Sequence, residues 1–211
     1  MTPVPVSYQT QMTQADLRII LNLGAVKVAA RLLGCIIAHH TNQGLITGQI
    51  IEVEAYTQND LASHSFNGET KRNAAMFGSA GTAYIYFTYG LHYCFNIVTG
   101  KTGIGEAVLI RAIRPLQGID AMWRNRYHAS IPDQPPAQKN KHLANGPAKL
   151  VQALGINFDY NGQDLLNENY PLQLLPAPIS MRKDAAVFNS TRVGISKDTN
   201  KRWRWYIKVL P

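Results

Sequence analysis

Hydrophobic and polar residues alternate most clearly between residues 45 and 56, and this stretch predicts a long β-strand. Strand residues two apart share a face, so Glu52, Glu54 and Tyr56 are predicted to point the same way. The opposite, apolar face is predicted to consist of Ile51, Val53 and Ala55. A carboxylate pair beside an aromatic ring on a rigid support is typical of an acid–base site.

The same patterns predict further elements on both sides of this strand. Four helices are predicted. The first has Thr13 as its N-cap and Asp16 in its first turn, and the second covers 26–33 and ends before Gly34. The third covers 118–126, and the fourth runs from an N-cap at Asn145 to Gly155. Strands are predicted at 35–40, 84–89, 92–98, 106–114 with Pro115 as its end, 192–196 and 202–209.

Two long connections separate these elements. Residues 57–79 are polar and irregular, with one helical turn predicted at 71–77, and a loop of this length after a carboxylate-bearing strand is typical of a functional segment. Residues 127–142 are rich in proline and lysine and predict a mobile basic surface loop. The element order favours an α+β fold, a single mixed domain over residues 1–211 whose first residues, 1–12, form a flexible segment.

Charge and cysteine content narrow the class of protein. The 211 residues carry a formal net charge of +8, which favours a polyanionic partner such as nucleic acid; simple solubility is the alternative. No apolar run reaches transmembrane length, the N-terminus lacks the pattern of a signal peptide, and Cys35 and Cys94 are far apart. We therefore expect no membrane association, no disulfide framework and a reducing cytoplasm.

The carboxylate pair has two interpretations. Glu52 and Glu54 can activate water for hydrolysis at a sugar carbon, or they can be ordinary solvated residues, which the pair alone favours about three to one. His64 can bind a phosphate, ligate a metal or move a proton, although most single loop histidines do none of these. No spacing typical of metal ligands occurs, so a metal-centred mechanism is not expected.

Aromatic residues are concentrated in the predicted hairpin at 84–98. Tyr84 and Tyr86 share a face with Thr88 and can form either a buried ladder or part of a site. Tyr89 lies at the predicted hairpin tip, where an exposed ring suits stacking on a base or insertion between base pairs. Asn96 lies among apolar residues and needs hydrogen-bond partners, which a substrate or the backbone can supply.

Several motifs, in order along the chain, resemble one known family. They are Glu52–Tyr56, Ala62–Ser65, Arg72–Phe77, Gly81–Tyr86, Tyr89–Asn96, Val108–Ala112, Asn145–Leu150 and Arg192–Ile195. Together they resemble the alkyladenine (3-methyladenine) DNA glycosylases of the mammalian type, which also occur in bacteria, and the match extends from about Leu32 to Tyr206.

The resemblance implies a curved antiparallel sheet and hydrolysis of the N-glycosidic bond of alkylated or deaminated purines, such as 3-methyladenine, 7-methylguanine, hypoxanthine and ethenoadenine. It implies a monomer acting on duplex DNA in the bacterial cytoplasm, associated with the nucleoid, without a cofactor. By position, Glu54 matches the base that activates water, and Arg111 matches the residue that holds this water and a phosphate.

The other matched positions form the base pocket. Tyr56, His64, Tyr86 and Asn96 match its walls, and Tyr89 matches the residue that fills the gap in the duplex after the base is flipped out. No lysine occurs in the matched pocket motifs, so a lyase step is not expected. Two alternatives remain at this point: a non-catalytic nucleic-acid-binding module, and a glycoside hydrolase that uses Glu52 with Glu54.

Overall fold

The computed structural model describes residues 12–88, 90–129, 139, 142–178 and 186–208. In this part of the chain, antiparallel pairing joins the strands into one curved sheet: β1 Ile36–Thr41, β2 Gly44–Tyr56, β3 Ala83–Thr88, β4 His92–Val98, β5 Ala107–Gln117, β6 Leu172–Leu175, β7 Ala186–Ser190 and β8 Arg204–Lys208. The helices are α1 Gln14–Leu21, α2 Ala25–Leu32, α3 Ile119–Tyr127 and α5 Pro147–Leu154, with short 3-10 turns at Ala74–Phe77 and Phe158–Tyr160. The predicted α+β fold is confirmed.

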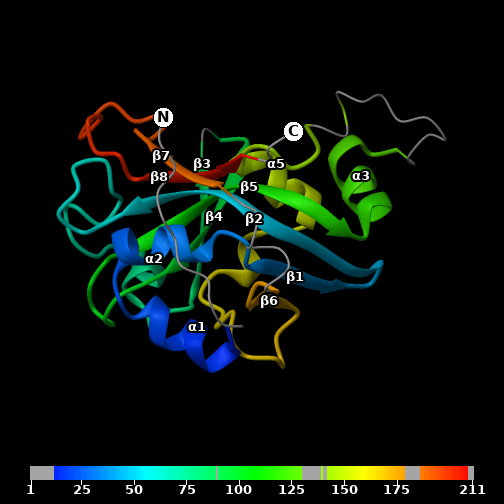
Figure 1. Cartoon of the computed structure of the whole chain (residues 1–211), viewed down its shortest axis with the longest axis horizontal. Coiled ribbons are helices and arrows are strands. Elements are labelled where there is room, and N and C mark those ends of the chain that lie inside the picture. The colour runs from blue at the N-terminus through cyan, green and yellow to red at the C-terminus, as the bar shows by residue number, and fades with distance from the viewer. Residues whose placement is uncertain (1–11, 89, 130–138, 140–141, 179–185, 209–211) are drawn as a thin grey trace.

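Strand β2 is the centre of the sheet, as Figure 1 shows. One of its edges pairs along 47–56 with β5, while the other pairs first with β1 and then, at 52–54, with β8. The sheet order β3-β4-β5-β2-β1-β6 therefore branches at β2, where β8 brings the C-terminal part of the chain beside the glutamates. This branch places residues far apart in sequence at one site.

Helices cover the apolar face of the sheet. Leu17 and Leu21 of α1, Val28 of α2 and Leu150 of α5 are fully buried in one core with Val53 of β2. At about 25 cal/mol per Å² of buried apolar surface, such side chains each contribute roughly 1.5–3 kcal/mol to folding. None of the helices among the described residues is long and apolar enough to cross a membrane.

The predicted helix ends are largely correct. Thr13 caps α1 in a reciprocal capping box with Asp16, and α5 ends at Gly155 in the left-handed conformation. The predicted Asn145 cap is wrong, because Gly146 is the N-cap residue of α5 and makes no side-chain cap bond. The Asn145 side chain instead accepts a hydrogen bond from Lys149 Nζ at 3.0 Å.

Two strand predictions need correction, and strand β7 was not predicted. Strand β5 continues through Pro115 to Gln117. On the edge that faces β4, only residues 107–109 of β5 are paired, so the missing N–H of Pro115 breaks no hydrogen bond to β4. The predicted strand at 192–196 is wrong, since the described strand here is β7. The segment after β7 uses its polar groups to bind the Ala55 carbonyl oxygen and the side chains of Glu54 and Asp60. Strand β6 was not predicted.

The alternation in β2 is interrupted by a bulge. Ile50 pairs with Ile113 and Glu52 with Ala112, which leaves Ile51 as an extra residue. The buried apolar residues are therefore Ile50, Val53 and Ala55, and the prediction that Ile51 belongs to this face is wrong. A compensating shift follows on β5 at Arg111.

A buried histidine in strand β1 predicts acid sensitivity of folding. His39 is 2% exposed; its Nδ1 lies 2.6 Å from the Leu154 carbonyl oxygen, and its Nε2 lies 2.9 Å from the Tyr160 hydroxyl. Burial lowers the pKa of His39 despite the opposing effect of the Leu154 carbonyl. The unfolded chain therefore binds a proton more readily, so the free energy of unfolding should fall as pH drops below about 6.5.

The variant His39→Gln should be less stable than wild type at neutral pH by roughly 1–2 kcal/mol, and it should lose less stability on acidification. Urea denaturation at about pH 7.5 and about pH 5 measures both effects. The exposed neighbour His40 is the matched control, because His40→Gln should follow the wild-type pH dependence. An equal acid response of the two variants would contradict the assignment to His39.

Candidate functional site

A cavity of about 450 Å³ opens between the ends of β2 to β5 and the segments that follow β2 and precede β8. Its walls include Tyr56, His64, Tyr86, Asn96 and Arg111. These five residues come from the central strand, the long loop, both strands of the β3–β4 hairpin and β5. The fold thus brings together side chains that the sequence analysis proposed for one pocket.

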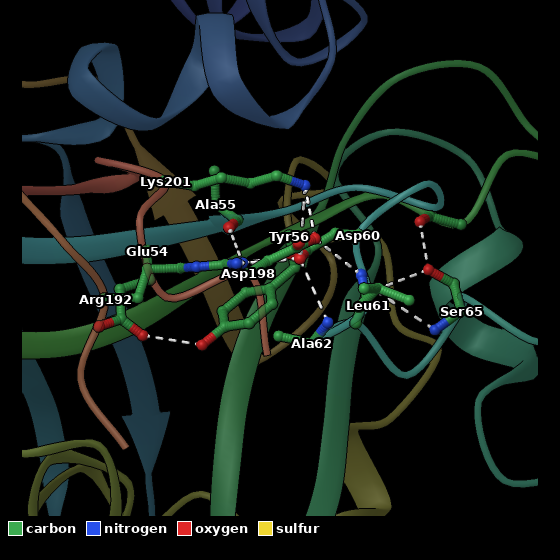
Figure 2. A network of polar contacts seen from close by, with 12 residues as sticks. Glu54, Ala55, Tyr56, Asp60, Leu61, Ala62, Ser65, Arg192, Asp198 and Lys201 are labelled. Atoms are coloured by element: carbon green, nitrogen blue, oxygen red, sulfur yellow. Dashed lines mark hydrogen bonds and ion pairs between the residues drawn. The ribbon is translucent and has the colours of Figure 1, made fainter. Parts of the chain in front are cut away.

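Glu54 lies directly behind this cavity wall and is fully buried. Its Oε2 accepts a 2.9 Å hydrogen bond from the Tyr56 hydroxyl, and its Oε1 accepts a 2.8 Å bond from the backbone N–H of Val193 (Figure 2 shows the Tyr56 contact). Arg111 Nη1 lies 3.3 Å from Oε2. All three partners line the cavity, and the interpretation of Glu54 as an ordinary solvated residue is wrong.

The Tyr56 hydroxyl is a stable donor in this arrangement. Burial, followed by the negative charge and hydrogen bond of Glu54, raises the pKa of Tyr56 well above its ordinary value. The hydroxyl therefore keeps its proton at any physiological pH. A carboxylate has about four acceptor positions, so the contacts with Tyr56, Val193 and Arg111 do not use all of them.

Glu52 has a different environment on the same strand. Its Oε1 accepts from Arg111 Nε at 2.8 Å and from Arg204 Nε at 2.7 Å. Burial alone would raise the pKa of Glu52, but the hydrogen bonds from Arg204 and Arg111 outweigh it and lower that pKa. Glu52 is thus a paired anion that holds Arg111 from the side opposite Glu54.

The bulges in β2 and β5 explain how one arginine reaches both glutamates. Arg111 lies between Ile110, which pairs with Val53, and Ala112, which pairs with Glu52, so it is the extra residue on its strand. Bulges commonly redirect a side chain next to a site. Leu109, two residues earlier, lines the cavity with Arg111, whereas Ile113 faces the core, so the alternation of side chains in β5 changes sides at this bulge.

The loop after β2 presents His64 at the cavity. Asn73 holds it in place, since its Nδ2 donates to the His64 carbonyl at 2.8 Å, and His64 Nδ1 lies 2.9 Å from the Tyr84 hydroxyl. Partial loss of surrounding water and then the charge of Arg72 lower the pKa of His64. The ring is therefore neutral at pH 7, and it can donate from one nitrogen and accept at the other.

The same loop is fixed to the rest of the protein through Ser65. Its hydroxyl donates to the Gly105 carbonyl oxygen at 2.6 Å. Gly105 allows this close approach, because a Cβ there would lie 2.3 Å from Ser65 Cβ and 2.7 Å from the Phe77 ring. The long loop is thus a packed wall of the cavity.

The tyrosines of β3 pack against each other and also line the cavity. Tyr84 is buried, its ring centroid is 5.5 Å from that of Tyr86, and the Tyr86 ring is 4.5 Å from the His64 ring in an edge-on arrangement. Both tyrosines line the cavity with Thr88, so the predicted shared face is confirmed. Burial raises the pKa of Tyr84 to about 12.

Asn96 is buried opposite Tyr84 on the neighbouring strand. Its Nδ2 donates to the Tyr84 backbone carbonyl at 3.0 Å, so the expected contact to the backbone is present. Asn96 also lines the cavity, where its amide can meet a ligand edge. The two possibilities raised by the sequence are therefore both open to this side chain.

Tyr89 lies outside the described residues. Two described residues near this position have exposed apolar side chains: Phe87 of β3 at 46% and Leu91 of the β3–β4 connection at 73%. Their sequence neighbours Thr88 and His92 line the cavity.

Sequence reasoning missed several cavity walls. Val193, Gly194 and Ile195 line the cavity, and so do Pro147 and Ala148 at the start of α5. Each belongs to a motif that carried the family resemblance, and this is the only sequence signal for them. Among the described residues, no group of three or more His, Cys, Asp or Glu side chains is placed to hold a metal ion, and no disulfide joins Cys35 and Cys94.

Comparison with known proteins gives a consistent picture. Residues 20–211 match the family model described as methylpurine-DNA glycosylase. A protein of Francisella tularensis subsp. tularensis, named "Putative 3-methyladenine DNA glycosylase", is 43% identical over 92% of this chain and 95% of its own length. A protein with the same name from Carboxydothermus hydrogenoformans is 43% identical over 86% of this chain and 88% of its own length. Another from Methanoculleus marisnigri is 46% identical over 87% of this chain and 90% of its own length.

Proposed function

Because this chain belongs to the methylpurine-DNA glycosylase family and is a DNA glycosylase, we propose that it excises alkylated and deaminated purines from duplex DNA. The proposed substrates are 3-methyladenine, 7-methylguanine, hypoxanthine and ethenoadenine, and the product is an abasic site. We propose that residues 1–211 act as one glycosylase domain and as a monomer.

The arrangement around Glu54 is the observation that carries this proposal. Its carboxylate is oriented by Tyr56, Val193 and Arg111, all at the wall of an aromatic-lined cavity. A water molecule on the remaining acceptor position can transfer a proton to Glu54 while its oxygen bonds to C1′ of the sugar. The C1′–N bond breaks as the new C1′–O bond forms, and the base leaves with the bonding electrons.

The base itself must leave the duplex to reach this cavity, at a cost of a few kcal/mol. Tyr56, His64 and Tyr86 all line the cavity and supply aromatic surfaces against which a flipped purine can stack. Asn96 supplies a polar group to its edge. A purine that is cationic through alkylation leaves as a neutral molecule, so one general base suffices for it.

The DNA-facing surface combines charge with apolar side chains. The net charge of +8 favours binding to phosphates, and the exposed Phe87 and Leu91 can contact the space vacated by the base. Tyr89 remains the residue predicted from the sequence to fill this gap. Arg111 is held by two carboxylates; we propose that it orients the water with Glu54, and its contact with a phosphate remains a prediction.

The environment of Glu52 argues against the glycoside hydrolase alternative. That chemistry requires two carboxylates on opposite sides of the bond that breaks. Glu52 is occupied by Arg111 and Arg204, whereas Glu54 is held by Tyr56 and Val193, which line the cavity. Glu54 is therefore proposed as the single carboxylate in the reaction.

The test is base release from duplex oligonucleotides that carry one hypoxanthine or one 7-methylguanine, with an undamaged duplex as control. We expect release from the damaged duplexes in a single exponential under enzyme excess, with loss of binding as salt rises from about 50 to about 200 mM. Binding to both damaged duplexes without release from either would overturn the proposal.

A further inference from the structure

A buried ion pair behind the cavity has no role in the chemistry described so far. Arg192 and Asp60 have fully buried side chains, and the guanidinium grips both carboxylate oxygens, with Nη2 at 2.9 Å from Oδ1 and Nη1 in contact with Oδ2. Arg192 Nη1 also donates to the Ala55 carbonyl oxygen at 3.0 Å. We name these two residues the Asp60–Arg192 pair.

The pair touches two of the groups that surround Glu54. The Arg192 guanidinium lies over the Tyr56 ring, 4.6 Å from its centroid, and Figure 2 shows it beside the tyrosine that donates to Glu54. The next residue, Val193, supplies the backbone N–H that binds Glu54 Oε1. One guanidinium therefore fixes both the ring and the peptide that orient this carboxylate.

The pair also holds the loop that carries His64. Asp60 Oδ1 accepts from the Ala62 N–H at 3.2 Å, two residues before His64. Asp198 accepts from the neighbouring Leu61 N–H at 3.0 Å, and Lys201 Nζ lies 2.6 Å from Asp198 and 3.8 Å from Asp60. The loop is thus tied to the same segment that contributes Val193.

Stability alone is a weak reason for such an arrangement. The free energy lost when two charges are removed from water is about as large as the free energy gained from their attraction. Proteins in which apolar residues of similar volume replace a buried ion pair are often at least as stable. Arg192 Nε, moreover, is buried without a hydrogen-bond partner among the described residues, which adds to the cost. A planar guanidinium that donates two hydrogen bonds to a carboxylate has a fixed orientation, and it therefore also fixes the positions of the groups that pack against it.

We propose that the Asp60–Arg192 pair is a positioning unit for the reaction, which sets the direction of the Glu54 carboxylate through Tyr56 and Val193. The inference rests on the proposed function, since it gives these two residues a role in the same site. Neither residue lines the cavity, so the effect is expected on the rate of the chemical step and not on DNA binding.

The variant Arg192→Lys tests this directly. Lysine keeps the positive charge next to Asp60, but it cannot lie flat on Tyr56 while donating to both carboxylate oxygens and to Ala55. In single-turnover release of hypoxanthine, we expect its rate constant to fall about 10- to 100-fold, as for a displacement of about 1 Å at a reacting group. The Kd for a duplex with a tetrahydrofuran abasic mimic, and the amplitude of release, should stay within about twofold.

The matched control is Arg18→Lys. Arg18 also pairs with an aspartate, Asp164, but on the surface, with 51% of its side chain exposed. Its rate constant should equal that of wild type. A second variant, Asp60→Asn, keeps the shape of the side chain and should slow release in the same direction as Arg192→Lys.

A double variant separates positioning from a purely structural role. If Arg192 acts through Glu54, adding Arg192→Lys to Glu54→Gln should cause almost no further loss, because the group being positioned is already gone. A wild-type rate constant in Arg192→Lys, a loss confined to the amplitude, or fully additive losses in the double variant would each overturn the inference alone. Failure of wild type to release any base would overturn the proposed function as well.

Discussion

Replacing Glu54 by glutamine should slow base release by about 10²- to 10⁴-fold, the usual contribution of a general base. Glutamine has the same length and can still accept the hydrogen bond from Val193, so the site keeps its shape. It cannot take a proton from water at neutral pH. Single-turnover release from the hypoxanthine duplex measures the change, and the Kd for the same duplex should remain close to that of wild type.

Glu52→Gln is the matched control for this variant. Glu52 lies two residues away on the same face of β2 and shares Arg111 with Glu54, but its other partner is Arg204, whereas Glu54 is held by Tyr56 and Val193. We expect a loss of less than about tenfold, since Arg111 keeps its contact with Glu54. An equal loss of rate in both variants would mean that Glu52 and Glu54 share the catalytic role. A wild-type rate in Glu54→Gln would mean that Glu54 is not the general base.

Local sequence patterns predicted the parts of this site that depend on short-range geometry. The two-residue period of a strand placed Glu52, Glu54 and Tyr56 on one face, and the contacts of Arg111 and Tyr56 with Glu54 agree with it. The period did not predict the bulge at Ile51. A bulge changes which residues are buried without changing the composition of the strand, so alternation alone places Ile51 on the wrong side.

Long-range contacts explain the remaining misses. Val193 acts through its backbone N–H on a glutamate 139 positions earlier, and a backbone group has no residue type to recognise. Residues 192–196 alternate in polarity and therefore resemble a strand, yet Arg192 leaves the sheet pattern to meet Asp60. Asp60 itself lies in a polar loop, where composition predicts exposure; only the partner 132 positions away explains its complete burial.

Replacing Asp60 by alanine should be among the most destabilising changes in this chain. The Arg192 guanidinium, fully buried, would lose its anion, and an uncompensated buried charge costs about 3–5 kcal/mol. Domains of this kind have about 5–15 kcal/mol of stability in total. Urea denaturation should show a large fall in the transition midpoint. The exposed ion pair is the control, because Arg18→Ala should cost no more than about 1 kcal/mol.

Removing both charges together should reverse most of this loss. In Asp60→Leu combined with Arg192→Met, no buried charge is left without a partner, and such replacements are often neutral or stabilising by about 1–4 kcal/mol relative to the ion pair. We expect the double variant to unfold near the wild-type urea concentration but to release bases about 10- to 100-fold more slowly, since nothing directs Tyr56 and Val193 toward Glu54. A double variant as unstable as Asp60→Ala would mean that the pair is required for packing, because loss of charge balance would no longer explain the effect.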